Sequence, residues 1–252
     1  MMRSSIWRFL VICFLVSGGP ANACSGEDNC AAGLVVKHYS STGPAQKTLA
    51  VFLHGDVSAG GSADYMLSSA QRFVADVPGA HAVVMLRPGY FDRNNVASEG
   101  SDCGRRNCYT EGVIRSVSAA IAEVKMRYGA KTVLGFGHSG GSAILANVLA
   151  SSPGLMTGAI LTSCPCDIRS WKRSWSNSLS PLDVVGRIPS STKVVAVTGR
   201  DDSNTVPAIA ERYVAALKAA GKDGTMILVD GTHDYRSVRS SALEQLKAMA
   251  AR

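Results

Sequence analysis

The chain has 252 residues, of which 46% are hydrophobic and 18% are charged. This apolar content can fill a hydrophobic core, and it excludes an intrinsically disordered chain, which is poor in apolar residues and rich in charge. No repeat or biased tract runs through the sequence, so collagen-like and low-complexity classes are excluded too. The net charge is +7, but the lysines and arginines are scattered along the chain, so we expect no nucleic-acid partner.

The first 23 residues have the composition of a secretory signal peptide. Arg3 and Arg8 provide a positive start, and an uninterrupted apolar run follows from Phe9 to Val16. Residues 21–23, Ala-Asn-Ala, match the small-residue pattern of a cleavage site. The apolar run is shorter than the roughly 20 residues that cross a bilayer, so we expect no membrane span.

Removal of this leader predicts a secreted or periplasmic protein with a single domain over residues 24–252. Lipid attachment at Cys24 is the alternative, because this cysteine directly follows the expected cleavage point. The residues before it lack the usual leucine of a lipoprotein signal, which favours simple export. The sequence does not predict an oligomeric state.

Six cysteines remain beyond the leader, and an even number in an oxidising compartment indicates disulfide bonds. Their spacing forms three close pairs, so we favour the local pairing Cys24–Cys30, Cys103–Cys108 and Cys164–Cys166. The last pair is the least secure, because a bridge between residues two apart is strained, and one of its members could reach the middle pair instead. A zinc site made by the last four cysteines is the functional alternative.

Short apolar runs alternate with longer amphipathic patterns along the rest of the chain. Strands are expected at residues 34–39, 49–53, 81–86, 133–136, 159–162, 194–198 and 226–229. Helices are expected at about 62–77, 110–129, 140–150, 206–220 and 237–250, with Thr110 as the N-cap of the second. Residues 87–109 and 163–181 show no clear pattern and are expected to be loops. This alternation predicts a mainly parallel sheet covered by helices on both faces, with a site beyond the carboxyl ends of the strands.

The strongest chemical signal is the sequence Gly137-His138-Ser139-Gly140-Gly141. It follows an expected buried strand and opens an expected helix, which is the context that makes G-x-S-x-G a nucleophile elbow. The tight turn requires small residues two positions before and after Ser139, and both are glycine. We therefore predict that Ser139 is a nucleophile and that the Gly140 N–H, at the helix start, donates to an oxyanion.

Five histidines compete for the role of the general base. His233 follows the last expected strand and precedes the last helix, which places it at the same edge of the sheet as the serine. His138 is next to the serine but points elsewhere in such a turn, and His54 is expected to support the oxyanion loop. The other two, His38 and His81, fall at strand positions. His233 is therefore the predicted base.

Two adjacent aspartates, Asp201 and Asp202, follow the strand expected at 194–198. Either one could orient a histidine on the neighbouring strand, and the chain order Ser, Asp, His suits this architecture. Spacing alone does not separate them.

Taken together, these motifs resemble those of the α/β-hydrolase superfamily, and the resemblance covers nearly all of residues 24–252. The residues that carry the resemblance are His54-Gly55, Gly137–Gly141, Gly199–Pro207 and Gly231–His233. The C-terminal third looks like dienelactone hydrolases and the catalytic domains of prolyl-oligopeptidase-type peptidases. The resemblance implies an α/β-hydrolase fold with no large lid domain.

The resemblance also implies roles for particular residues. The triad acid of such proteins usually follows glycine as G-x-x-D, which favours Asp202, although the longer spacing from Asp202 to Val206-Pro207 keeps Asp201 as an alternative. The second oxyanion donor would be the backbone N–H of Asp56, with Val57 as its alternative.

The expected activity is hydrolysis of small carboxylic esters through an acyl-enzyme on Ser139, with no metal or organic cofactor. The alternatives are a serine peptidase of the prolyl-oligopeptidase-like type and a binding protein on a catalytically retired fold. Trp171 and Trp175 either line an acyl or aromatic pocket or pack their own segment down. The nearby basic residues Arg169, Lys172 and Arg173 suit either an anionic substrate or a solvated face, and the latter is favoured.

Overall fold

The computed structural model describes residues 22–26, 29–43 and 47–251. Residues 1–21 of the expected leader lie outside this range. Within the described part of the chain, no helix is both long and apolar enough to cross a membrane.

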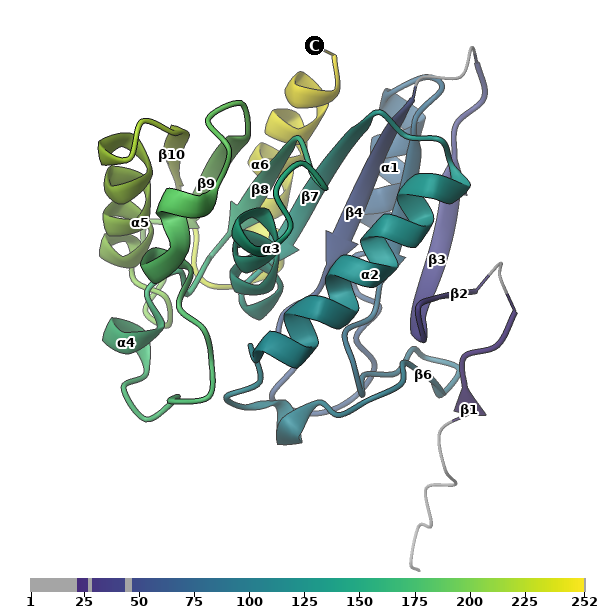
Figure 1. Cartoon of the computed structure of the whole chain (residues 1–252), viewed down its shortest axis with the longest axis horizontal. Helices are drawn as coiled ribbons and strands as arrows, with labels where there is room; N and C mark the ends of the chain where they lie inside the picture. The colour runs from purple at the N-terminus through teal and green to yellow at the C-terminus, as the bar shows by residue number, and fades with distance from the viewer. Residues whose placement is uncertain (1–21, 27–28, 44–46, 252) are drawn as a thin grey trace, which may run out of the picture.

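The core of the molecule is an eight-stranded sheet with the order β10-β9-β8-β7-β4-β5-β3-β2 (Figure 1). Six strands run parallel to one another: β4 (Thr48–Leu53), β5 (His81–Met85), β7 (Thr132–His138), β8 (Gly158–Thr162), β9 (Lys193–Gly199) and β10 (Asp223–Val229). The remaining two, β3 (Leu34–Ser40) and β2 (Cys30–Ala31), form an antiparallel edge beside β5. The mainly parallel sheet predicted from the alternating pattern is therefore confirmed.

Helices cover both faces of the sheet, as Figure 1 shows. One face carries α2 (Glu111–Arg127), α3 (Gly140–Ser151) and α5 (Pro207–Ala219), and the other carries α1 (Leu67–Asp76) and α6 (Tyr235–Ala250). Because side chains alternate along a strand, neighbouring residues of β4 enter different cores. Val51 packs with the first group of helices, whereas Phe52 packs with the second.

Two element boundaries differ from the sequence prediction by more than two residues, and tertiary contacts explain both. Helix α1 begins at Leu67 and not at 62, because the Ala63 N–H donates to the Phe91 carbonyl and Asp64 pairs with Arg93. Strand β10 begins at Asp223 and not at 226, because its polar first residues pair in register along β9.

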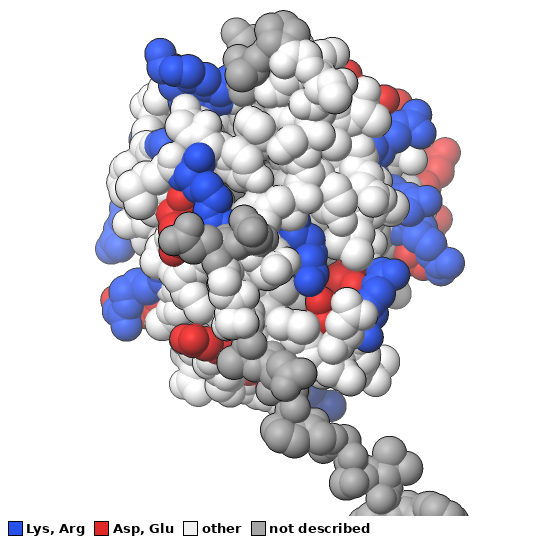
Figure 2. Space-filling view, turned by 90° about the vertical axis from the view of Figure 1, so that its right-hand side faces the viewer, with Lys and Arg blue, Asp and Glu red and all other residues white. Residues whose placement is uncertain are grey.

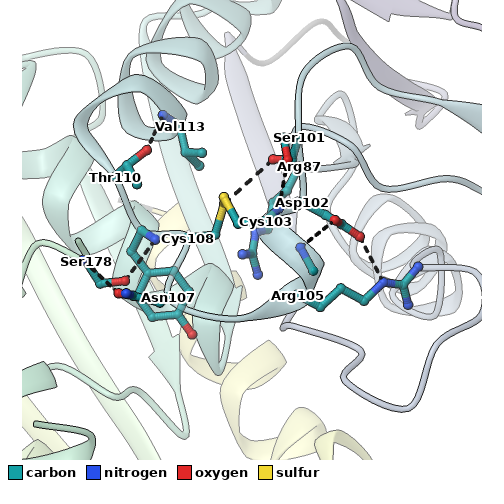
Figure 3. Close-up of a disulfide and its surroundings, with 12 residues drawn as sticks. Arg87, Ser101, Asp102, Cys103, Arg105, Asn107, Cys108, Thr110, Val113 and Ser178 are labelled. Carbon is teal, nitrogen blue, oxygen red and sulfur yellow. Dashed lines mark hydrogen bonds and ion pairs between the residues drawn. A yellow bond between two sulfur atoms is a disulfide. The ribbon is translucent and has the colours of Figure 1, made fainter. Parts of the chain in front are cut away.

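The segments expected to be loops contain short elements. Residues 87–109 include β6 (Val96–Ala97), which pairs with β1 (Asn22–Ala23), and the 3-10 turn η1 (Cys103–Arg105). The segment 163–181 contains α4 (Ile168–Trp171) and leads into η2 (Pro181–Arg187). Helix α2 has the predicted cap, since the Thr110 side chain accepts a hydrogen bond from the Val113 N–H (Figure 3).

The six cysteines form the three local disulfides that the spacing favoured: Cys24–Cys30, Cys103–Cys108 and Cys164–Cys166. The Cα atoms of the last pair are 5.1 Å apart, within the ordinary range for a disulfide. Figure 3 shows the middle bridge closing a loop beside Arg87 and Arg105.

Charged side chains do not gather into one patch on the face shown in Figure 2, where blue groups are separated by white surface and several lie beside red ones. Ion pairs such as Lys37–Asp92, at 2.8 Å, and Arg127–Glu123, at 2.9 Å, join opposite charges around the antiparallel edge of the sheet. This arrangement agrees with the scattered basic residues of the sequence.

We expect protein purified from an oxidising compartment to contain no free thiol when it is denatured without reductant, because all six of these cysteines are bridged. Alkylation followed by mass spectrometry checks this, and a reduced sample is the control. Labelling at Cys13 would show that the leader was retained, and labelling at Cys164 and Cys166 would contradict the third bridge.

Candidate active site

The candidate nucleophile lies in a tight turn between β7 and α3. Ser139 has φ 50° and ψ −119°, a conformation that few non-glycine residues adopt. The turn follows the buried strand directly, and α3 starts at the next residue. Because the backbone reverses so sharply, the Ser139 side chain stands above the carboxyl edge of the sheet.

The glycines around Ser139 are required by close backbone approaches. A Cβ at Gly137 would lie 2.6 Å from the Ser142 nitrogen, and a Cβ at Gly141 would meet the carbonyl oxygens of Leu53 and His54. Both contacts involve backbone atoms, which cannot move aside by a change of rotamer as a side chain can. Gly137 is therefore required by the tightness of the turn itself, and Gly141 by the contact of the turn with the end of β4.

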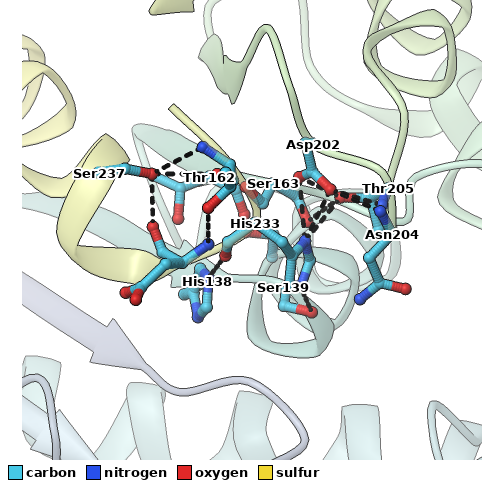
Figure 4. A network of polar contacts seen from close by, with 12 residues as sticks. His138, Ser139, Thr162, Ser163, Asp202, Asn204, Thr205, His233 and Ser237 are labelled. Carbon is cyan, nitrogen blue, oxygen red and sulfur yellow. Dashed lines mark hydrogen bonds and ion pairs between the residues drawn. The ribbon is translucent and has the colours of Figure 1, made fainter. Parts of the chain in front are cut away.

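Three residues that the sequence singled out lie in one hydrogen-bonded chain (Figure 4). The Ser139 Oγ and the His233 Nε2 are 3.0 Å apart, and the His233 Nδ1 lies 2.9 Å from Asp202 Oδ2 and 3.1 Å from Oδ1. The serine hydroxyl donates to Nε2, and the Nδ1–H donates to the carboxylate. Each residue comes from a loop that follows a different parallel strand, namely β7, β9 and β10.

The geometry separates the two adjacent aspartates. Asp202 is buried, and its carboxylate accepts hydrogen bonds from the N–H groups of Asn204 and Thr205 and from the Thr205 hydroxyl. Burial opposes ionisation, but the bonds from His233 and Thr205 outweigh it and lower the pKa of Asp202. Asp201 is exposed, and its N–H donates to the Gly231 carbonyl. The three residues after Asp202 fold back onto its carboxylate, which accommodates the longer spacing before α5.

His138 links two loops on either side of the serine, a connection that the sequence did not reveal. The Gly55 N–H donates to the Tyr65 hydroxyl, which donates to His138 Nδ1, and both bonds are 2.7 Å long. The His138 Nε2–H then donates to the His233 carbonyl at 3.1 Å. Burial, with His233 nearby, lowers the pKa of His138 to about 4, so the ring is neutral, as this set of bonds requires.

The loop directly after β4, which contains Asp56 and is the expected oxyanion loop, is held by a buried ion pair. The Asp56 carboxylate accepts hydrogen bonds from Arg87 Nη1, at 2.9 Å, and from the Tyr109 hydroxyl, at 2.6 Å, while the Tyr90 hydroxyl donates to the Asp56 carbonyl. Arg87 is fully buried, yet the attraction of Asp56 overcomes the burial penalty and raises its pKa. The same ion pair lies against the start of α3, because a Cβ at Gly140 would be 2.6 Å from Asp56 Oδ1.

His54 supports this loop, as expected. Its Nε2 accepts from the Arg87 N–H at 3.0 Å, and its Nδ1–H donates to the Gly55 carbonyl at 2.7 Å. Sequence reasoning missed Arg87 and Tyr109. The sequence does contain a signal for Arg87, which is a lone arginine immediately after an apolar strand. A charge at such a position is buried and therefore needs a partner of opposite charge.

A pocket of about 780 Å³ opens over Ser139 and His233. Trp171 lines this pocket, whereas Trp175 packs behind it, with ring centroids 5.0 Å from Trp171 and 5.5 Å from Tyr109. Of the three basic residues near the tryptophans, Lys172 lines the pocket, Arg169 pairs with Asp183, and Arg173 is exposed. Trp171 therefore forms part of the pocket wall, and Trp175 packs against Trp171 from outside the pocket.

Comparison with known proteins identifies the fold. No protein-family model and no curated protein matches the sequence. Among solved structures, the chain is similar to esterase PE8, with a TM-score of 0.65 and 17% identity over 86% of this chain and 98% of that one. It is also similar to a candidate dienelactone hydrolase from Klebsiella pneumoniae, with a TM-score of 0.64 and 15% identity over 87% and 93% of the two chains.

A third similar structure is the acylaminoacyl peptidase of Pyrococcus horikoshii, with a TM-score of 0.65 and 15% identity. The match covers 84% of this chain but only 38% of the peptidase. All three similarities concern the architecture of the sheet and its helices. The chain therefore has the α/β-hydrolase fold that its motifs implied.

We expect the free energy of unfolding to fall as the pH is lowered from about 6.5 to 5. The pKa of His138 is lowered to about 4, and burial beside Arg87 holds the pKa of His54 well below its ordinary value. The unfolded chain therefore binds protons in this range that the folded chain does not bind, at roughly 1.4 kcal/mol per pH unit for each proton.

Urea titrations at several pH values measure this slope. His138→Gln keeps one donor and one acceptor and should reduce the slope by about one proton, whereas the same change at the partly exposed His81 should reduce it much less. An unchanged slope in His138→Gln would contradict the buried neutral state of this histidine.

Proposed function

We propose that this protein is an exported serine hydrolase that cleaves small carboxylic esters. The observation that carries the proposal is the hydrogen-bonded chain from Ser139 through His233 to Asp202, of which Ser139 and His233 line the pocket. Such a chain supplies what a serine hydroxyl lacks on its own, namely a base in contact and a carboxylate that orients the base. Export rests on the leader pattern in residues 1–23.

In the proposed mechanism, the Ser139 Oγ attacks the ester carbonyl carbon while its proton moves to His233 Nε2. The carbon–oxygen bond to the alcohol then breaks, and Nε2 returns that proton to the leaving oxygen. Water attacks the acyl-serine, with Nε2 again taking and then returning a proton, and the acid is released. Asp202 keeps hydrogen on Nδ1, so that Nε2 is free to accept throughout.

The backbone N–H groups of Gly140 and Asp56 are the proposed oxyanion donors. An N–H at the first position of a helix has no acceptor within that helix, which leaves the Gly140 donor available. The Asp56 donor depends on the position of its loop, which the buried contact with Arg87 holds against the start of α3. In related chemistry one such donor contributes about 10²–10³ to the rate.

The size of the pocket favours an ester over a peptide. A peptide bond requires the histidine proton to be aligned on the leaving nitrogen, with the substrate held in register on both sides of the bond. The pocket is formed by loops, by α4 and by the start of α6, and its volume of about 780 Å³ suits a small molecule. Peptide hydrolysis is the second candidate, because the acylaminoacyl peptidase shares the fold.

We expect Ser139→Ala and His233→Ala each to remove nearly all ester hydrolysis without unfolding the protein, since the two residues act as one unit. Asp202→Asn should lower kcat by several orders of magnitude, and Asp201→Asn is the matched control with little effect, because its carboxylate is exposed. Rates on a 4-nitrophenyl ester, with thermal melts of each variant, measure this. Substantial activity in folded Ser139→Ala would contradict the proposed nucleophile.

A panel of substrates tests the ester preference. We expect acetyl and butyryl esters to be cleaved faster than palmitoyl esters, because the described part of the chain places no lid over a long acyl chain, and faster than aminoacyl or prolyl amides. Comparison of kcat/KM across the panel is the measurement. An optimum at palmitate would indicate a lipase, and a faster amide would indicate a peptidase.

A further inference from the structure

The pocket over Ser139 carries more positive than negative side-chain charge. Lys172, Arg236 and Arg239 line it, against the carboxylates of Asp56 and Asp234. Asp56 is already paired with the buried Arg87. Asp234 is bound by Arg236, with Nη2 2.6 Å and Nε 3.1 Å from its Oδ2. The charges that remain uncompensated in the pocket are those of Lys172 and Arg239.

Neither of these two cations contacts a carboxylate within the described part of the chain. The acidic residues nearest to Lys172 in the sequence have other partners: Asp167 pairs with Arg212 at 3.1 Å, and Asp183 pairs with Arg169 at 2.8 Å. Lys172 is therefore a cation at the pocket wall whose ammonium hydrogens are available to an anion from outside the chain.

Aromatic contacts hold Lys172 in place. Its ammonium nitrogen lies 4.2 Å from the Trp171 ring centroid and 4.5 Å from that of Trp175, which is close enough for cation–π attraction to both rings. The Trp171 indole N–H donates to the Asn204 carbonyl at 2.8 Å. Asn204 lies in the turn that encloses Asp202, so the position of the cation is tied to the catalytic loop.

We propose that the natural substrate carries a carboxylate in addition to its scissile ester, and that Lys172 binds this carboxylate, with Arg239 adding to the attraction. The inference rests on the proposed hydrolase function and identifies its substrate class as the half-esters of dicarboxylic acids and other carboxylate-bearing esters. The exposed face of Trp171 provides an apolar wall for the carbons that join the two groups. A charge-assisted hydrogen bond of this kind is expected to contribute roughly tenfold to kcat/KM.

Two fluorogenic esters with the same leaving group test this proposal: the 4-methylumbelliferyl half-ester of glutaric acid and 4-methylumbelliferyl hexanoate. The leaving group and the scissile bond are identical, so the ratio of their kcat/KM values reports the effect of a terminal carboxylate in place of an apolar end of similar size. We expect a ratio of about ten in favour of the half-ester at low salt, falling as ionic strength rises.

Substitutions then locate the effect. Lys172→Met should bring the ratio close to one, Lys172→Arg should restore most of it, and Arg239→Gln should reduce it by a smaller factor. Arg173→Met is the matched control, because Arg173 is the next residue in the chain but is exposed and does not line the pocket. This variant should leave the ratio unchanged. Thermal melts establish that each variant is folded.

Labelling with a fluorophosphonate probe separates failure of this inference from failure of the proposed function. If Ser139 is labelled and the wild-type ratio is one or lower, or if Lys172→Met keeps the wild-type ratio, the carboxylate assignment is overturned and the serine hydrolase stands. If Ser139 is not labelled and neither ester is cleaved, the proposed function is overturned and the substrate assignment falls with it.

Discussion

The close approach between the Ser139 turn and the end of β4 is the constraint on which the rest of the site depends. Gly141 passes so near the carbonyl groups of Leu53 and His54 that no side chain fits there. This contact brings together the serine turn and the proposed oxyanion loop, which follow adjacent strands of the sheet, so that both can reach one carbonyl of the proposed substrate. A displacement of either segment would separate the proposed nucleophile from the proposed oxyanion donors, and catalysis is sensitive to errors of about 1 Å.

The pair of Asp56 and Arg87 secures this approach at a cost in desolvation. Two buried charges are stable only when each is well paired, because the penalty for removing them from water is of the order of several kcal/mol for each ion. Here the carboxylate also receives the Tyr109 hydroxyl, and the arginine lies 4.9 Å from the Tyr90 ring centroid. An apolar pair could fill the same space, but it would provide no directional bonds to orient the loop. The buried pair therefore serves to fix the geometry of the loop.

Neutral hydrogen bonds connect the remaining loops. His138 joins Tyr65, and through it Gly55, to the carbonyl of His233, so the loop carrying the proposed base is positioned relative to the oxyanion loop. The loop after β9 is connected through Thr205, whose hydroxyl donates to Asp202 and lies 3.1 Å from the Ser163 carbonyl after β8. Loops from several strands thus form one connected framework around the pocket.

The order of strands and helices, the serine turn and the position of His233 at the same edge of the sheet as the serine were all readable from the sequence, because they depend on local patterns. Each of these patterns reflects what the backbone needs within a few residues. The examples are the alternation of apolar residues, the helix cap at Thr110 and the glycines at 137 and 141. The resemblance favoured Asp202 over Asp201, and the structure shows that Asp202 is the one that contacts the histidine. Tertiary structure alone decided that Arg87 and Tyr109 hold Asp56, and that Lys172 rather than Arg169 lines the pocket. These depend on contacts between residues far apart in the chain, where the direction of a side chain follows from how separate strands and loops pack together, and no local pattern encodes it.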